Sequence, residues 1–185
     1  MAEKTRGKRY AIVLDSKKCI NCKACVVACK AENGVPVGHF RDWINEERRG
    51  TWPHLMASFD PEQCHHCENP SCVRVCPTGA SWQRKDGIVL VNYPDCIGCR
   101  YCMIACPYNA RYYREDLGVV DKCTFCAHRV DRGQLPACVE TCPSKVRVFG
   151  DIDDPDSDLS QLLSTRRFLV KNPQTGNGPQ LYYLL

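Results

Sequence analysis

Sixteen cysteines in four groups of four constrain this 185-residue chain more than any other feature of its sequence. The first group, CINCKACVVAC, has the spacing C-x2-C-x2-C-x3-C, and CIGCRYCMIAC repeats that spacing as the third group. The second group widens the middle gap to four residues, and the fourth group widens it to eleven. Such internal repetition indicates one kind of site built four times. The groups, called motifs 1 to 4, are Cys19, Cys22, Cys25 and Cys29; Cys64, Cys67, Cys72 and Cys76; Cys96, Cys99, Cys102 and Cys106; and Cys123, Cys126, Cys138 and Cys142.

The spacing suits iron–sulfur chemistry, because a cubane [4Fe–4S] cluster is held by four cysteine thiolates. Three closely spaced cysteines can wrap one face of a cubane in a tight loop. The fourth cysteine follows on a helical turn and points away from that cluster, and in two-cluster ferredoxins it ligates the neighbouring cluster. Proline follows the last cysteine of motifs 2, 3 and 4 and turns the chain out of the site, whereas Lys30 follows Cys29. Sixteen thiolates predict four complete [4Fe–4S] clusters and leave no open metal site for a substrate.

Disulfides and zinc are the alternative uses of so many cysteines. The cysteine content approaches that of a disulfide scaffold, but such scaffolds do not require this regular spacing. Structural zinc usually takes two short cysteine pairs separated by a longer spacer. Motif 4, within DKCTFCAHRVDRGQLPACVETCP, has that form, whereas motifs 1 and 3 do not. Zinc is therefore an alternative to a cluster at motif 4 alone.

The four motifs in this order resemble those of the iron–sulfur electron-transfer subunits of molybdopterin oxidoreductases of the dimethyl sulfoxide reductase family. The phrases PEQCHHCENPSCVRVCPTGAS, CPYNARY, DKCTFCAHRV and LPACVETCP are most similar to the polysulfide and thiosulfate reductase branch. The resemblance covers most of residues 10–151. Some relatives replace one cysteine of the fourth motif by tryptophan and hold a three-iron cluster, but this chain keeps all four cysteines.

The residues alone leave two ways to pair the motifs: neighbours in sequence, or motifs 2 and 3 nested within motifs 1 and 4. The resemblance implies the nested scheme, in an α+β fold of two bacterial-ferredoxin-like dicluster modules with short strands and helices. Residues 9–34 and 111–150 would form the outer module, 35–59 a linker, 60–110 the inner module, and 151–185 a C-terminal extension. In this scheme cluster 1 is bound by Cys19, Cys22, Cys25 and Cys142; cluster 2 by Cys123, Cys126, Cys138 and Cys29; cluster 3 by Cys64, Cys67, Cys72 and Cys106; and cluster 4 by Cys96, Cys99, Cys102 and Cys76.

Between the motifs the sequence predicts short strands and turns. SWQRKDGIVLVN alternates around an Asp-Gly turn and indicates a hairpin, and ARYYRED with LGVVD indicates another. RYAIVLD and KVRVFGD are typical of strands, and CVVACKAEN and CMIACP of short helices that carry the fourth ligands. Beyond residue 151, DDPDSDLSQLLSTRR predicts a capped helix, followed by a loop in NPQTGNGPQ and a terminal strand in LYYLL.

No catalytic residues are expected, because the sequence shows no paired carboxylates, no nucleophile with a base and no phosphate-binding loop. The resemblance implies a non-catalytic subunit that carries electrons between a quinone-reactive membrane anchor subunit and a molybdopterin-containing catalytic subunit. A free polyferredoxin and an electron subunit of another molybdopterin oxidoreductase are the alternatives. The formal net charge is +4. Four clusters with their thiolates add about −8, which leaves the loaded protein mildly negative and argues against nucleic-acid binding.

The sequence has no apolar window of the roughly 18 residues that a membrane-spanning helix needs, and no leader is visible at its start. In relatives of the polysulfide and thiosulfate reductase branch, such a subunit crosses the membrane folded beside a catalytic subunit with a twin-arginine signal. The resemblance therefore implies a membrane-associated complex on the outer, periplasmic face of the cytoplasmic membrane, without a signal peptide in this chain. The cytoplasmic face is the alternative.

Several side chains near the motifs are candidates for a supporting role. His65 and His66, in the loop of motif 2, either donate hydrogen bonds to a cluster, contact a partner or face solvent. Trp43 and Trp52, in the expected linker, either dock a partner or pack over the clusters. The insertion AHRVDRGQLPA of motif 4 is expected to loop out toward solvent or a partner. The basic residues beside the motifs, which either offset cluster charge or lie in solvent, are Lys17, Lys18, Lys23, Arg100, Lys122 and Arg129.

Overall fold

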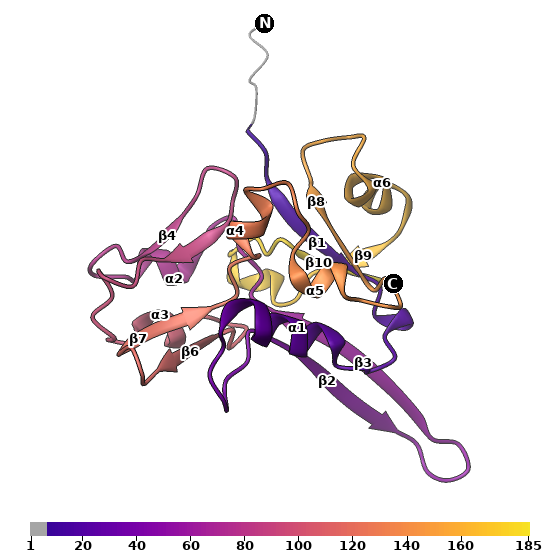
Figure 1. Ribbon diagram of the computed structural model, residues 1–185. Helices are drawn as coiled ribbons and strands as arrows, with labels where there is room; N and C mark the ends of the chain where they lie inside the picture. Colours follow the sequence, from indigo (N-terminus) through magenta and orange to yellow (C-terminus); the bar gives the residue numbers. More distant parts are fainter. Residues whose placement is uncertain (1–6) are drawn as a thin grey trace, which may run out of the picture.

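Strand β1 (Tyr10–Leu14) lies inside a four-stranded sheet of the computed structural model, which describes residues 7–185 (Figure 1). Its last four residues are buried, as expected for a short apolar run enclosed on both faces. On one side β1 pairs antiparallel with β8 (Arg147–Asp151), and on the other it pairs parallel with β10 (Leu181–Leu184). β9 (Phe168–Leu169) completes the order β8-β1-β10-β9. The strands predicted near both ends of the chain are confirmed, and they meet in this sheet.

Two hairpins follow motifs 2 and 3. β4 (Ser81–Gln83) and β5 (Val89–Val91) pair around the predicted Asp-Gly turn. Gly87 has a φ of 85° there, a left-handed conformation that glycine adopts without steric cost. β6 (Arg111–Arg114) and β7 (Val119–Lys122) form the second hairpin. Both predicted hairpins are confirmed, and they lie on the same side of the molecule (Figure 1).

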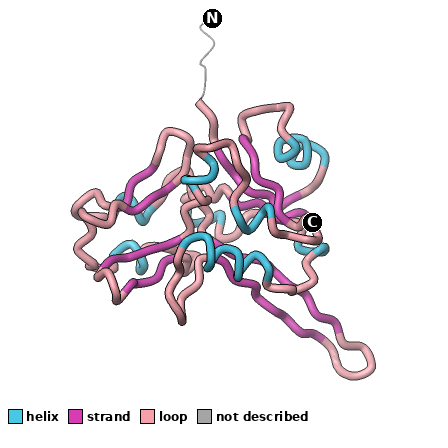
Figure 2. Tube along the Cα trace, viewed as in Figure 1, coloured by secondary structure: helices cyan, strands magenta, loops and turns pink. Residues whose placement is uncertain are grey.

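A third hairpin occupies the segment that we expected to be a linker. β2 (Asp42–Arg49) and β3 (Met56–Gln63) pair antiparallel along their full length and project from the body of the molecule (Figures 1 and 2). Trp43 packs against the core at the root of the hairpin, whereas Trp52 near the tip is 84% exposed. Sequence patterns do not indicate β2, because its charged run, DWINEERR, lacks the apolar alternation of a half-buried strand. The expected module boundary at residue 60 falls inside β3.

Short helices follow the cysteine loops and pair between motifs. α1 (Ala24–Asn33) packs against α5 (Ala137–Glu140), which brings motifs 1 and 4 together. α2 (Ser71–Arg74) packs against α3 (Tyr101–Ile104), which brings motifs 2 and 3 together. α3 ends before Cys106, earlier than predicted, because the proline that follows this cysteine disfavours the helical conformation of the residue before it.

The C-terminal segment wraps back onto the main sheet. α6 (Asp158–Thr165) is capped as predicted, since the Ser157 hydroxyl accepts a hydrogen bond of 3.1 Å from the backbone N–H of Ser160. Leu159 of this helix is fully buried, and the helix packs against β1 and β8. Three further short elements complete the chain: η1 (Ser16–Lys18), α4 (Ala127–Val130) and η2 (Pro173–Thr175).

The main hydrophobic core runs through the cysteine loops. Cys25, Cys64, Cys123 and Cys138 belong to the same buried group as Ile12 of β1. Short helices combined with small sheets confirm the predicted α+β class. Between residues 7 and 185, no helix has the length and apolar character needed to cross a bilayer.

Candidate metal centre

Each cysteine loop holds a residue in the left-handed conformation directly before its second cysteine. These residues have φ between 42° and 66°, and they are Asn21, His66, Gly98 and Phe125. Alternating left-handed and right-handed residues turn successive N–H groups inward and form an anion-binding concavity, as in many iron–sulfur sites. The repeat in the sequence is therefore also a repeat in the backbone. Asparagine and glycine commonly adopt this conformation, but nothing in the sequence marked the histidine and the phenylalanine.

Three small cavities are each lined by four cysteines, three from one motif and one from another. The three cavities are similar in size, so they suit occupants of the same size. In chain order of their loops, we name them site 1, lined by Cys19, Cys22, Cys25 and Cys142; site 3, lined by Cys64, Cys67, Cys72 and Cys106; and site 4, lined by Cys76, Cys96, Cys99 and Cys102.

The four remaining cysteines lie together where α1 packs against α5, and we name this group site 2. Cys29, Cys123, Cys126 and Cys138 are all buried. The side-chain amide nitrogen of Asn33 lies 3.8 Å from Cys29 Sγ and 3.7 Å from Cys126 Sγ, so it bridges motifs 1 and 4. Burial, followed by the charge of Cys29, raises the pKa of the Cys123 thiol well above its usual value. These four thiols therefore share one environment.

The donors present fit an iron–sulfur cubane at all four sites. Each site offers four thiols, the soft ligands that suit iron and sulfide. Motif 4, the candidate for zinc, is divided between two sites. Cys142 lines the cavity of motif 1, whereas the other three cysteines of motif 4 lie with Cys29. A closed zinc site built from motif 4 alone would need its four cysteines around one ion.

The four sites form a row through the molecule. Arg147 lines site 1, and its charge acts on cysteines of both site 1 and site 2. Cys64 of site 3 lies close enough to Cys123 of site 2 to add to the burial effect on its pKa. Arg111 lines the cavities of both site 3 and site 4. At the two ends of the row, Cys22 of site 1 and Cys99 of site 4 are exposed.

Burial changes the acidity of the thiols. It raises the pKa of Cys25 to about 11 and that of Cys29 and Cys67 to about 12. Cys76 shifts the other way: burial opposes the change, but hydrogen bonds, led by that from the Ser81 N–H, lower its pKa. The buried thiols are protonated at neutral pH unless a metal binds them, so cluster binding must release their protons.

His65 and His66 are buried in the wall of site 3, so the solvated-loop and partner-contact alternatives were wrong. The ring of His66 stacks on Phe125 with centroids 3.7 Å apart, and its Nδ1 accepts a hydrogen bond of 3.0 Å from the Val89 N–H. Burial lowers the pKa of His66 well below its ordinary value, so the ring is neutral and carries its proton on Nε2. His65 Nε2 lies 2.6 Å from Glu62 Oε1. Both rings help to exclude water from site 3.

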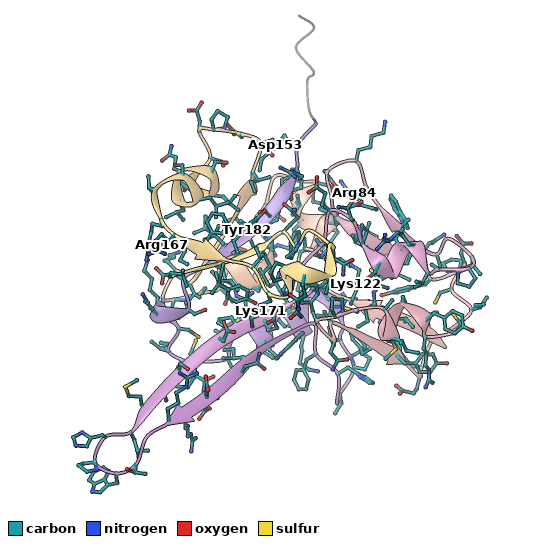
Figure 3. All side chains as sticks on the ribbon, turned by 180° about the vertical axis from the view of Figure 1, so that it is seen from behind. Arg84, Lys122, Asp153, Arg167, Lys171 and Tyr182 are labelled. Atoms are coloured by element: carbon teal, nitrogen blue, oxygen red, sulfur yellow. The ribbon has the colours of Figure 1, made fainter. Side chains whose placement is uncertain are left out.

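The basic residues near the motifs have different surroundings. Lys122 is 1% exposed, and its ammonium donates to the carbonyl oxygens of Val89 and Cys123; Figure 3 labels it within the body of the molecule. Arg129 instead pairs with Glu32 at 3.0 Å, and it offsets a carboxylate. The buried position of Lys122 beside Cys123 thus supports the prediction that it offsets cluster charge. The ion pair of Arg129 with Glu32 does not support that prediction for Arg129.

Sequence reasoning missed three buried arginines: Arg41, Arg111 and Arg147, which are 5%, 4% and 3% exposed. Arg41 and Arg147 each pair with a buried aspartate, at 2.7 and 2.8 Å. Arg111 instead donates a hydrogen bond of 2.9 Å to the sulfur of Cys72. Their local sequences do not distinguish these arginines from exposed ones at strand ends, so only the tertiary structure reveals them.

Only the second part of the insertion of motif 4 loops out as expected, since residues 131–135 are exposed. The first part instead packs against the chain. It contains helix α4, whose apolar side chains are buried. Two charged residues of the insertion pair within the chain: Arg129 with Glu32 of α1, and Asp131 with Arg84 at 2.6 Å. These ion pairs link the insertion to α1 and to the turn that follows β4.

Comparison with known proteins gives the family. A model described as a 4Fe-4S dicluster domain matches residues 55–152, more than half of the chain, and a second model with the same description matches residues 18–80. The chain belongs to the 4Fe-4S dicluster family. The predicted membership among the iron–sulfur electron-transfer subunits of molybdopterin oxidoreductases is confirmed, and sixteen cysteines with two dicluster domains fit four [4Fe–4S] clusters.

Several relatives match this 4Fe-4S dicluster protein over nearly its whole length. A tetrathionate reductase subunit of Salmonella typhimurium is 44% identical over 95% of this chain and 72% of its own length. The putative dimethyl sulfoxide reductase iron-sulfur subunit of Halobacterium salinarum is 40% identical over 95% of this chain and 78% of its own length. The arsenate respiratory reductase iron-sulfur subunit of a Shewanella species is 36% identical over 95% of this chain and 96% of its own length. The chain is thus an iron–sulfur electron-transfer subunit of the reductase type.

Proposed function

We propose that this subunit transfers electrons between a quinone-reactive membrane anchor subunit and a molybdopterin-containing catalytic subunit of a polysulfide or thiosulfate reductase-like respiratory complex. The row of four cysteine sites, closed in the middle and exposed at both ends, carries the proposal. The relative named for tetrathionate reductase supports a sulfur compound as the substrate of the complex. Relatives named for arsenate and selenate make those substrates alternative outcomes of the test.

We assign one [4Fe–4S] cluster to each site, with the ligands of the nested scheme. The grouping of Cys142 with motif 1, and of Cys106 with motif 2, supports this assignment. The packing of α1 on α5 and of α2 on α3 supports an outer module of residues 9–34 and 111–150 around an inner module of 60–110. We therefore propose a cluster, and not zinc, for the cysteines of motif 4.

The clusters, when bound, supply one-electron oxidation and reduction. The chain itself fixes their positions through the cysteine loops and excludes water from the middle of the row. All four cysteines of site 2 are buried, whereas Cys22 and Cys99 at the ends are exposed. Electrons therefore enter at one end of the row and leave at the other.

Exposed apolar side chains surround the two open ends. Beside Cys99, Ile97, Tyr101 and Ile104 are 66%, 60% and 83% exposed, and beside Cys22, Ile20 is 63% exposed. Clustered apolar exposure of this kind is typical of a protein–protein contact. We assign one end to the catalytic subunit and the other to the membrane subunit.

The experiment that tests the function is anaerobic isolation of the native complex. We expect a brown protein with about sixteen irons per chain, bleached by dithionite, together with a molybdopterin-containing large subunit and a membrane subunit. A colourless chain with four zincs would contradict the clusters. A four-cluster chain that purifies without partners would instead favour the free polyferredoxin.

The proposed location is the outer, periplasmic face of the cytoplasmic membrane, and it has its own test. Protease added to spheroplasts should digest this subunit while cytoplasmic markers survive. Protection of the subunit until the membrane is broken would move the complex to the cytoplasmic face.

A further inference from the structure

Arg111 lies between site 3 and site 4 and lines the cavities of both. It is the first residue of β6, and it is 4% exposed. Its Nη2 donates hydrogen bonds of 2.9 Å to Cys72 Sγ, in site 3, and of 2.7 Å to Ser81 Oγ, in the wall of site 4. One guanidinium therefore touches the walls of two neighbouring cluster sites.

Among residues 7–185, no carboxylate forms an ion pair with Arg111. Within the described part of the chain, its side-chain hydrogen bonds go to Cys72 and Ser81, and its Nη1 is buried without a hydrogen-bond partner. Arg147, between sites 1 and 2, is equally buried, but Asp42 neutralises it at 2.8 Å. Burial opposes the charge of Arg111, yet its electrostatic interaction with the nearby cysteines, first of all Cys72, raises its pKa. An arginine in a protein keeps its proton, so this charge is permanent.

A permanent buried cation favours the more negative state of a neighbouring cluster. Reduction adds one electron, and the attraction between that charge and the guanidinium is strong where water is excluded. Hydrogen bonds to the sulfurs and nearby charge are among the factors that set cluster potentials. The Nη1 group of Arg111, which is buried and has no hydrogen-bond partner, remains available as a further donor.

We propose that Arg111 raises the reduction potentials of the clusters at sites 3 and 4, so that this single side chain tunes one half of the electron path, from the middle of the row to the end at site 4. The proposal rests on the assignment of clusters to these two sites in the proposed function. It makes Arg111 an electrostatic partner of the clusters, acting partly through the ligand Cys72.

The test is a redox titration of the full, cluster-loaded chain, followed by electron paramagnetic resonance. In Arg111→Gln we expect two of the four clusters to become at least tenfold harder to reduce, about 59 mV downward for a one-electron couple, while the other two keep their potentials. Arg111→Lys, which keeps the charge, should recover most of the shift. Arg114→Gln is the matched control, because this arginine lies on the same strand but pairs with Asp116 at 2.7 Å and should leave all four potentials unchanged.

Unchanged potentials in Arg111→Gln with about sixteen irons retained would overturn the proposal. If Arg111→Gln loses iron, a second variant, Ser81→Asp, tests the proposal instead. Ser81→Asp leaves Arg111 in place and gives the guanidinium a carboxylate partner. The same two potentials should fall in Ser81→Asp, and unchanged potentials there would also overturn the proposal. A wild-type chain without four cubanes would contradict the proposed function itself. Failure of the proposed function can therefore be distinguished from failure of the proposal about Arg111.

Discussion

Cys142 is the residue on which the two pairing schemes differ most plainly. It follows α5 late in the chain, yet it lines site 1 with three cysteines from the first motif. Cys29 shows the reverse exchange, because it lies in α1 beside the cysteines of motif 4. In each case the cysteine follows its own loop on a helical turn and faces the neighbouring site, as in two-cluster ferredoxins.

This exchange predicts which variants affect the same cluster. Cys142→Ser and Cys22→Ser should perturb one electron paramagnetic resonance signal, and Cys29→Ser and Cys126→Ser should perturb another, since serine is a weaker ligand for iron than a thiolate. The measurement is the spectrum of each reduced variant. If Cys142→Ser and Cys126→Ser perturbed the same signal instead, motif 4 would be a self-contained site.

A carboxylate network forms a second centre of interactions at the residue scale. Glu62 of β3 accepts hydrogen bonds from the Tyr183 hydroxyl at 2.9 Å and from the ammonium of Lys171 at 2.5 Å. Its side chain is 6% exposed, so it depends on these partners. The network ties the projecting hairpin to the C-terminal strand.

We predict that Lys171→Met lowers the free energy of unfolding by about 1–3 kcal/mol, because the buried carboxylate loses a charged donor. Thermal unfolding of the cluster-loaded protein measures it. Lys85→Met is the control, since Lys85 is an exposed lysine and its loss should change stability little. Equal melting of the two variants would show that the network does not contribute.

At the scale of elements, short helix α3 combines two roles. Cys102 within it is buried and lines site 4, whereas Ile104 at its end is 83% exposed. A four-residue helix gives little stability by itself. Its position comes from packing against α2 and β6, which leaves its apolar outer face in solvent.

We predict that Ile104→Ser leaves the iron content and the cluster potentials unchanged but weakens binding to the redox partner at this end at least tenfold. The physical reason is that an apolar side chain buried at the centre of a contact surface can contribute about 1.4 kcal/mol or more to binding, which is tenfold in affinity. Affinity can be measured by titrating the chain into the partner subunits. Val37→Ser is the control, because Val37 is 96% exposed outside this surface; an equal loss in both variants would contradict the docking role.

At the scale of the whole molecule, the cysteine sites take the place of an ordinary core. Buried cysteines from motifs 1, 2 and 4 belong to the main apolar group, and short helices and two-stranded hairpins surround it. The separate apolar group between α6 and β1 is small. Folding of the chain is therefore expected to depend on its clusters.

We predict that chelating the iron abolishes the native circular dichroism of the full chain. Each cysteine that loses its iron takes up a proton at neutral pH, because the pKa of an ordinary thiol is about 8.5. Where the surrounding fold persists, burial raises this pKa further, to about 11 for Cys25 and about 12 for Cys29. Cluster loss should therefore become easier as the pH falls and harder as it rises. Native circular dichroism without iron, or loss that is independent of pH, would count against this account.

The sequence by itself determined the local structure and the chemistry. The spacing of the cysteines predicted four iron–sulfur sites, and the alternation around Asp-Gly and in ARYYRED predicted two hairpins, because these signals depend on residues near one another. Ser157 likewise marked the start of α6 by a local hydrogen bond. None of these features needed information about distant contacts.

Only the tertiary structure decided which distant segments meet. The sequence did not indicate that β10 lies beside β1, that the charged strand β2 forms a hairpin, or that the first part of the insertion of motif 4 packs as helix α4. It also did not reveal that Arg111 is buried between two sites, since an arginine at a strand end has the same local pattern when exposed. The physical reason is that burial and charge environment depend on long-range packing, whereas spacing and turns are local.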